Sequence, residues 1–196
     1  MRLTAPTSAP QLELPDTQGQ TITLGDGGRP TLLCFFRDAA CPFCNLRVYE
    51  LTERHPSLHA RGLAITAVFV ATTDDVRRFV ACRPRPFPVI ADPDGAAHAA
   101  YGIERSFWRK LKAIVTRMPA LIRGLRIVGL AGLNTSNLMP ADFLIDARGR
   151  IVEAYYGKDA GDRIPFERVE RFLAGQPRAR RDRSVPDADA AAQGRR

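Results

Sequence analysis

Two cysteines, Cys41 and Cys44 in the run Cys-Pro-Phe-Cys, are the residues of this chain best suited to chemistry. They follow the apolar run 31–36 and precede a helical pattern, so both thiols lie at a strand-to-helix junction. With Cys41 as N-cap and Pro42 as first helical residue, the amides of Phe43 and Cys44 point at the Cys41 sulfur. A free thiol of pKa ~8.5 is only about 3% ionised at neutral pH, whereas such a site lowers the pKa to roughly 3.5–7.5. We therefore predict Cys41 as nucleophile and Cys44, one turn on, as the thiol that resolves a mixed disulfide.

The alternative for this pair is half of a zinc site. The sequence contains no second Cys-x-x-Cys and no matching histidine pair to complete four ligands, so redox chemistry is favoured. Because the intervening Pro42 and Phe43 add no positive charge, we predict a reduction potential between about −270 and −120 mV, the reducing and strongly oxidising extremes of protein dithiols of this kind.

The other cysteines and histidines carry weaker signals. Cys34 lies in the middle of a predicted strand and is interpreted as buried and inert, whereas a part for Cys82 in the chemistry stays open. His55 and His59 have the spacing of a metal pair on a helix, but surface positions near a helix end are the favoured interpretation. We assign no role to His98.

Hydrophobic periodicity and turn residues predict the elements that position the cysteines. Strands are expected at 12–14, 21–24, 31–36, 63–70, 87–92, 139–146 and 150–156. Helices are expected at 42–58, from Thr72 through Val80, at 96–101, and after 162–165 with Phe166, Val169, Phe172 and Leu173 facing inward. The first strand pair reads as a small hairpin, and the remaining order is β-α-β-α, an insert, then β-β-α. This order predicts an α/β fold with a central mixed sheet and helices on both faces.

The insert before the last hairpin, residues 104–138, is apolar and basic. It is expected to form one or two amphipathic helices broken at Pro119 and Gly124. A lid that packs its apolar face on the domain is the favoured interpretation. Weak docking on anionic lipid is the alternative, because Trp108 and its basic neighbours suit a membrane interface.

The net charge of +8 is unevenly distributed. Residues 105–139 contain seven basic side chains and no acidic one, and residues 176–196 contain six arginines against three aspartates. The positive charge thus lies in one insert and one tail, which argues against a nucleic-acid-binding protein. We expect an extended lead-in at 1–10, one domain at 11–175 and a disordered tail at 176–196. Without an export signal or a long apolar segment, the sequence reads as cytoplasmic and soluble.

The pattern as a whole resembles the thioredoxin fold, a three-layer α/β/α arrangement. The resemblance rests on Phe-Phe-Arg-Asp-Ala-Ala before Cys41, and on Met139-Pro140 opening Ala-Asp-Phe-Leu-Ile-Asp about a hundred residues later. It spans roughly residues 9–174. More narrowly, the chain is similar to the peroxiredoxin-like branch of the alkyl hydroperoxide reductase/thiol-specific antioxidant superfamily that carries Cys-x-x-Cys. This resemblance implies that Met139 and Pro140, joined by a cis bond, lie against the cysteines and help to position substrate.

The chain departs from the ordinary peroxiredoxin pattern Pro-x-x-x-Thr/Ser-x-x-Cys. Cys34 takes the proline position and Asp38 takes the hydroxyl position, which argues against strong peroxidase activity. A carboxylate of Asp38 near Cys41 would raise the pKa of the thiol, and Arg37 or an arginine of the insert would compensate.

The function expected from these observations is that of a thiol-dependent, antioxidant oxidoreductase. It would reduce peroxides or protein disulfides without a bound cofactor or metal, and an external dithiol donor such as the thioredoxin or glutathione system would regenerate it. The alternative is a non-catalytic thioredoxin-fold module whose insert and tail bind a membrane or an acidic partner. The oligomeric state does not follow from the sequence.

Overall fold

The computed structural model describes residues 1–129 and 136–176. Its strands are β1 (Thr7–Ser8), β2 (Leu12–Pro15), β3 (Thr21–Leu24), β4 (Thr31–Phe36), β5 (Ala64–Phe69), β6 (Val89–Ala91), β7 (Ala141–Ile145) and β8 (Arg150–Tyr156). Its helices are α1 (Pro42–Ala60), α2 (Thr73–Phe79), α3 (Ala96–Ala100), α4 (Phe107–Thr116), α5 (Met118–Val128) and α6 (Phe166–Ala174).

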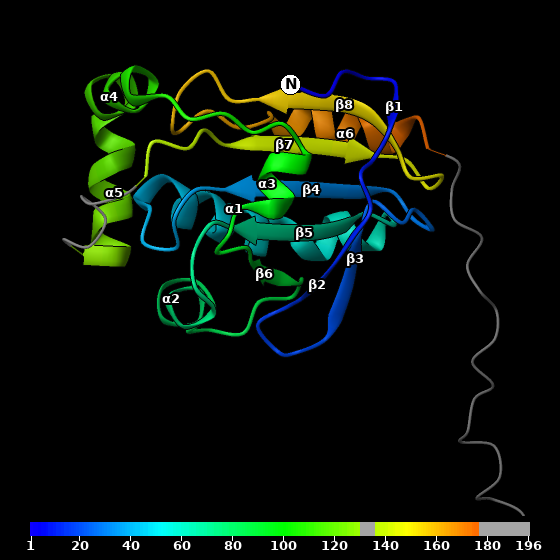
Figure 1. The fold of residues 1–196 in the computed structure, drawn as a ribbon, viewed down its shortest axis with the longest axis horizontal. Coiled ribbons are helices and arrows are strands. Elements are labelled where there is room, and N and C mark those ends of the chain that lie inside the picture. The colour runs from blue at the N-terminus through cyan, green and yellow to red at the C-terminus, as the bar shows by residue number, and fades with distance from the viewer. Residues whose placement is uncertain (130–135, 177–196) are drawn as a thin grey trace, which may run out of the picture.

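A six-stranded mixed sheet in the order β1-β8-β7-β4-β5-β6 forms the centre of the molecule (Figure 1). Strands β4, β5 and β6 are parallel, and β7, β8 and β1 are added antiparallel on the other side of β4. The strands β2 and β3 form a separate hairpin. Central β4 is thus hydrogen-bonded on both sides, which fixes the strand end from which Cys41 follows.

Side chains of β4 alternate between two hydrophobic clusters, as the period of a buried strand requires. Leu32 and Phe36 belong to the cluster that contains residues of α1, α2, α5 and α6, whereas Leu33 and Phe35 belong to the cluster with α3 and the hairpin. Figure 1 shows α1 and α6 behind the sheet and α3 in front of it. The predicted α/β/α layering, the mixed sheet and the N-terminal hairpin are confirmed.

The N-terminal lead-in, predicted only as an extended segment, contributes a strand to the sheet. Thr7 and Ser8 pair with Ile151 and Arg150, so the segment adds an edge strand to the sheet. The predicted disordered tail lies outside the described residues from 177 onward. No helix in the described ranges is long and apolar enough to cross a membrane.

The insert folds as two helices at the end of the sheet where β4 finishes (Figure 1). The predicted break near Pro119 is confirmed, because α4 ends at Thr116 and Pro119 lies in the first turn of α5. The predicted break at Gly124 is wrong. This glycine lies inside α5, where a Cβ atom would come within 2.5 Å of the Pro42 carbonyl oxygen. The missing side chain therefore serves close packing of α5 against the start of α1.

Candidate active site

Cys41 caps the N-terminus of α1 as predicted. Its backbone is extended, with φ −67° and ψ 122°, and Pro42 occupies the first turn. The Cys44 amide donates a hydrogen bond to the Cys41 sulfur over 3.4 Å. Both cysteines are free thiols, so the site is in its reduced form.

The surroundings of Cys41 favour its thiolate. Complete burial raises its pKa, but hydrogen bonds from the Cys44 thiol and amide and the positive charges of Arg37 and Arg163 outweigh burial and lower the pKa to about 6. Cys44 shows the opposite direction: burial, followed by its hydrogen bond to Cys41 and the charge on Cys41, raises its pKa well above the usual value. The two thiols thus differ in acidity: the surroundings favour a thiolate at Cys41 and a protonated thiol at Cys44.

Arg37 and Asp38 together bind the backbone of Ser136. Arg37 is 1% exposed; one of its guanidinium nitrogens lies 3.7 Å from the Cys41 sulfur and another donates to the Ser136 carbonyl. The Asp38 carboxylate accepts from the Ser136 amide over 2.7 Å. The predicted compensation by Arg37 agrees with this geometry. The pKa of Cys41, about 6, lies within the predicted range of roughly 3.5–7.5, so the cations and hydrogen bonds outweigh any rise caused by the Asp38 carboxylate.

Met139 and Pro140 are both buried near the start of β7, and Met139 belongs to the same hydrophobic cluster as Cys41 and Cys44. The predicted cis bond between them is wrong: among the described residues, the cis peptide bond is Ala5–Pro6. A prolyl bond prefers trans by only about 0.5–1 kcal/mol, so its surroundings decide. Here the Met139 amide donates to the Glu104 carbonyl and the Pro140 carbonyl accepts from Gly157, so both groups are satisfied with the trans bond.

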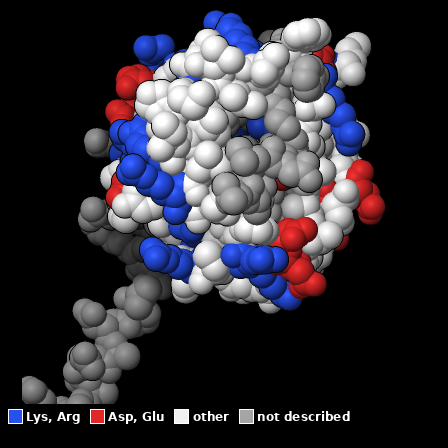
Figure 2. All heavy atoms as spheres, turned by 90° about the vertical axis from the view of Figure 1, so that its left-hand side faces the viewer, with Lys and Arg blue, Asp and Glu red and all other residues white. Residues whose placement is uncertain are grey.

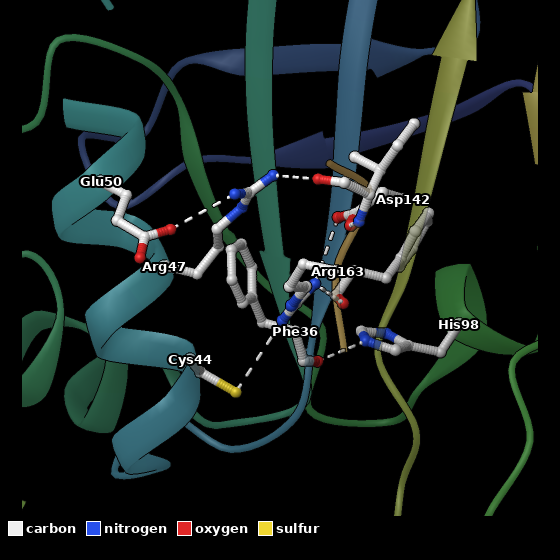
Figure 3. A network of polar contacts seen from close by, with 9 residues as sticks. Phe36, Cys44, Arg47, Glu50, His98, Asp142 and Arg163 are labelled. Carbon is white, nitrogen blue, oxygen red and sulfur yellow. Dashed lines mark hydrogen bonds and ion pairs between the residues drawn. The ribbon is translucent and has the colours of Figure 1, made fainter. Parts of the chain in front are cut away.

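Arg163 and Asp142 are site residues that the sequence analysis missed (Figure 3). The Arg163 guanidinium donates to Asp142 over 3.2 Å and to the Phe35 carbonyl over 2.9 Å, and it lies 4.0 Å from the Cys44 sulfur. It also stacks on the Phe36 ring at 4.0 Å. Asp142 is completely buried in β7 and accepts from the Ile164 amide as well. A paired, buried cation is therefore held against the second thiol.

The same network extends to two further buried side chains (Figure 3). Arg47 of α1 donates to the Ile164 carbonyl over 2.7 Å, which connects the cysteine helix to the segment that carries Arg163. His98 lies between the Asp92 carboxylate, at 2.7 Å, and the Phe36 carbonyl, at 2.8 Å. His98 was given no role, yet it holds the end of β4 one residue before Arg37.

The remaining candidate residues lie outside this cluster. Cys34 is completely buried next to Asp142 across the β4–β7 pair, and burial together with the aspartate raises its pKa well above the usual value. Its predicted inertness agrees with this environment. Cys82 is exposed, and His55 and His59 stack on each other on the outer side of α1 with ring centroids 5.1 Å apart. Within the described parts of the chain, no three His, Cys, Asp or Glu side chains are arranged to hold a metal ion.

Cys41 and Cys44 are completely buried, and α5 packs beside them: Leu121 belongs to their hydrophobic cluster and Gly124 lies against Pro42. Arg117, at the start of α5, forms ion pairs with Asp159 at 2.9 Å and Asp162 at 3.7 Å. A cavity of about 390 Å³ lies between α1, α5 and the segment 161–167, and its lining includes Phe43 and Arg163. A reagent that reaches the sulfurs therefore requires α5 or this segment to move.

Comparison with known proteins places this geometry in context. The AhpC/TSA family model matches residues 6–154. A Mycobacterium tuberculosis protein assigned to the peroxiredoxins is 23% identical over 163 residues, which cover 81% of this chain and 88% of that protein. Peroxiredoxin Bcp of Escherichia coli K12 is 26% identical over 117 residues, covering 58% of this chain and 75% of Bcp.

Solved structures agree on the fold. The crystal structure of peroxidoxin BcpB from Mycobacterium tuberculosis superimposes with a TM-score of 0.60 at 16% identity, covering 86% of this chain and 93% of BcpB. At this identity the likeness concerns the fold, and it confirms the thioredoxin-like architecture.

Proposed function

The chain belongs to the AhpC/TSA family of thiol-dependent oxidoreductases, and on this premise we propose that it reduces peroxides with Cys41 as attacking thiolate and Cys44 as resolving thiol. The observation that carries the assignment is the lowered pKa of Cys41, about 6, at the capped start of α1. At pH 7 a group of this pKa is about nine-tenths ionised. The nucleophile is therefore ready before the substrate arrives.

In the first step the Cys41 thiolate attacks one oxygen of the peroxide. The S–O bond forms as the O–O bond breaks, the leaving oxygen takes a proton and departs as water or an alcohol, and Cys41 becomes a sulfenic acid. The adjacent guanidinium of Arg37, 3.7 Å from the sulfur, supports negative charge that moves from sulfur to oxygen.

In the second step Cys44 attacks the sulfenic sulfur, the S–S bond forms, and the hydroxyl of the sulfenic acid leaves as water with the thiol proton. Two of the three leading causes of the raised Cys44 pKa are its hydrogen bond to Cys41 and the charge on Cys41. Oxidation removes the second of these, because the sulfenic sulfur no longer carries that charge. Arg163, 4.0 Å from the Cys44 sulfur, then favours the second thiolate.

An external dithiol completes the cycle by returning two electrons and two protons to the disulfide. We assign this part to a thioredoxin or glutathione system and place the reaction in the cytoplasm. The non-catalytic alternative receives no support from the curated relatives, which are peroxiredoxins.

Substrate size decides between a peroxide and a protein disulfide as the substrate, because the substrate has to reach the buried sulfurs. Both sulfurs are buried, and the adjacent cavity of about 390 Å³ suits a small or flexible hydroperoxide. A folded protein disulfide would have to displace α5.

The test measures consumption of hydrogen peroxide, an organic hydroperoxide and insulin disulfide by the reduced protein in parallel, with Cys41→Ser and Cys44→Ser. We expect peroxide consumption by the wild type, none by Cys41→Ser, and a single turnover by Cys44→Ser that leaves a sulfenic acid which dimedone labels. Peroxide turnover by Cys41→Ser at the wild-type rate would overturn the assignment of the nucleophile. Consumption of insulin disulfide alone would identify a disulfide reductase.

A further inference from the structure

Helices α4 and α5 carry large apolar side chains that are exposed to solvent. We call these residues the outer face: Trp108 (76% exposed), Leu111 (41%), Val115 (68%), Met118 (45%), Ile122 (47%) and Ile127 (53%). Elsewhere in the described residues, the exposed large apolar side chains are Met1, Tyr49 and Val152, which are far apart in the sequence. Isolated exposed apolar residues are normal, but a concentration on one helix pair indicates a binding surface.

The outer face is additional to the face with which the insert packs on the domain. On α5 the buried residues are Leu121, Gly124 and Val128, at the spacing of one helix face, and Leu121 joins the cluster of the cysteines. On α4 the exposed Trp108, Leu111 and Val115 follow the same i, i+3, i+7 spacing, whereas Ala113 is buried. The outer residues therefore lie apart from the residues that each helix buries.

The charged side chains of helices α4 and α5 themselves are all basic. Residues 105–139 contain Arg105, Arg109, Lys110, Lys112, Arg117, Arg123 and Arg126 and no Asp or Glu. Figure 2 looks at this end of the molecule and shows uncharged side chains over its upper part, Lys and Arg to the left and below, and some Asp and Glu at the left, right and lower right margins. The surface thus combines apolar side chains, a tryptophan and cations.

We propose that the outer face binds the surface of an anionic lipid bilayer. Amphipathic helices with tryptophan and aliphatic residues on one side and Lys or Arg beside them lie in the bilayer interface, where the apolar side chains enter the acyl boundary and the cations meet lipid phosphates. Charge disfavours a second copy of the chain as occupant, because a two-fold interface would place this acid-free segment against itself. The proposal concerns binding and does not depend on the proposed redox chemistry.

The structure also provides a direct probe. Trp108 is the single tryptophan of the chain, so intrinsic fluorescence reports on the outer face alone. The full-length protein is mixed with vesicles of phosphatidylcholine, or of equal parts phosphatidylcholine and phosphatidylglycerol. We expect a blue shift of the Trp108 emission, quenching by brominated acyl chains and co-sedimentation with the phosphatidylglycerol vesicles, all weakened by added salt.

Substitutions on the outer face test whether this surface is the one that binds the vesicles. Val115→Ser with Ile122→Ser, and separately Lys112→Glu with Arg126→Glu, are each expected to lower the bound fraction at least about fivefold. The matched controls are Val152→Ser on β8, an apolar residue as exposed as Ile122, and Arg148→Glu in the turn before β8; both should bind as the wild type does.

Three outcomes would overturn the proposal. The first is no spectral shift and no sedimentation with anionic vesicles. The second is sedimentation that survives in both outer-face variants, which would assign lipid binding to the arginine-rich tail. The third is a blue shift without lipid that follows protein concentration together with a larger sedimentation coefficient, which would identify a second copy as the occupant.

Discussion

At the scale of single residues, the acidity of Cys41 depends on Arg37. Replacing Arg37 with Met removes a charge 3.7 Å from the sulfur, so the pKa of Cys41, about 6 in the wild type, should rise by roughly 1 unit or more. The measurement is the rate of iodoacetamide alkylation of Cys41 against pH. Arg37→Lys, which keeps the charge, should stay closer to the wild type. A wild-type midpoint near 8.5 would contradict the assigned thiolate.

The same shift makes the stability of the reduced protein depend on pH. The pKa of Cys41 is lower in the folded than in the unfolded chain, where it is about 8.5. Its stabilising contribution is therefore complete above pH ~8.5 and is lost as pH falls through about 6.

Arg163 is expected to matter for both stability and chemistry. Arg163→Met leaves the completely buried Asp142 without its ion pair, and breaking a buried pair in this way costs about 3–5 kcal/mol. It also removes the cation beside Cys44, so the sulfenic acid on Cys41 should persist longer. Denaturant unfolding and dimedone trapping measure the two effects. Arg168→Met, which breaks a partly exposed pair with Glu153, should cost less than Arg163→Met and leave the trapping unchanged.

His98 is expected to stabilise the fold by holding the end of β4 in place. His98→Leu leaves the Asp92 carboxylate and the Phe36 carbonyl without their ring partner, at a cost of about 1–3 kcal/mol for each group. Denaturant unfolding measures the loss. His59→Leu, an exposed histidine on α1, should change the free energy of unfolding by less than about 0.5 kcal/mol. Equal losses in the two variants would show that the buried bridge contributes nothing.

At the scale of elements, the packing of α5 on α1 limits access to the thiols. In Gly124→Ala the new methyl group would lie 2.5 Å from the Pro42 carbonyl oxygen, so α5 has to shift away from the cysteine helix. We expect a stability loss of about 1–3 kcal/mol and faster alkylation of the buried thiols. Gly175→Ala is the control, because its nearest atoms lie at 3.6 Å. A slower alkylation in Gly124→Ala would show that α5 does not cover the site.

Local sequence signals predicted the elements and the capping position of Cys41 well. The strand before Cys41, the proline after it and the Thr72 cap are all local patterns, and each element they predict is present. Gly124 was misread because a glycine in a helical pattern signals either a break or close packing, and only the neighbouring α1 distinguishes them.

The site residues that the sequence did not predict depend on contacts between segments far apart in the chain. Asp142 interrupts a buried apolar strand, and a buried carboxylate needs a partner, so its position was a usable signal. Its partner Arg163 lies in an irregular segment with no periodicity that would have identified it. His98 likewise acts across two segments, from α3 to the end of β4.

At the scale of the whole molecule, the outer face and the dithiol lie at the same end. The sheet end from which Cys41 follows is covered by α5, and α4 and α5 carry the exposed apolar residues (Figure 1). If the reaction and the lipid contact both hold, the enzyme should reduce a phospholipid hydroperoxide faster in vesicles that contain phosphatidylglycerol than in pure phosphatidylcholine.

Comparing the rate on vesicles with the rate on hydrogen peroxide in solution separates the effect of lipid binding from the chemistry at the cysteines. Val115→Ser with Ile122→Ser should remove the advantage of anionic vesicles while leaving the rate with hydrogen peroxide unchanged, because neither side chain contributes to the cysteine site. Cys41→Ser should abolish both rates without changing vesicle binding. An equal loss of both rates in the outer-face variant would mean that these residues support the fold of the lid, and membrane proximity would then play no part in the choice of substrate.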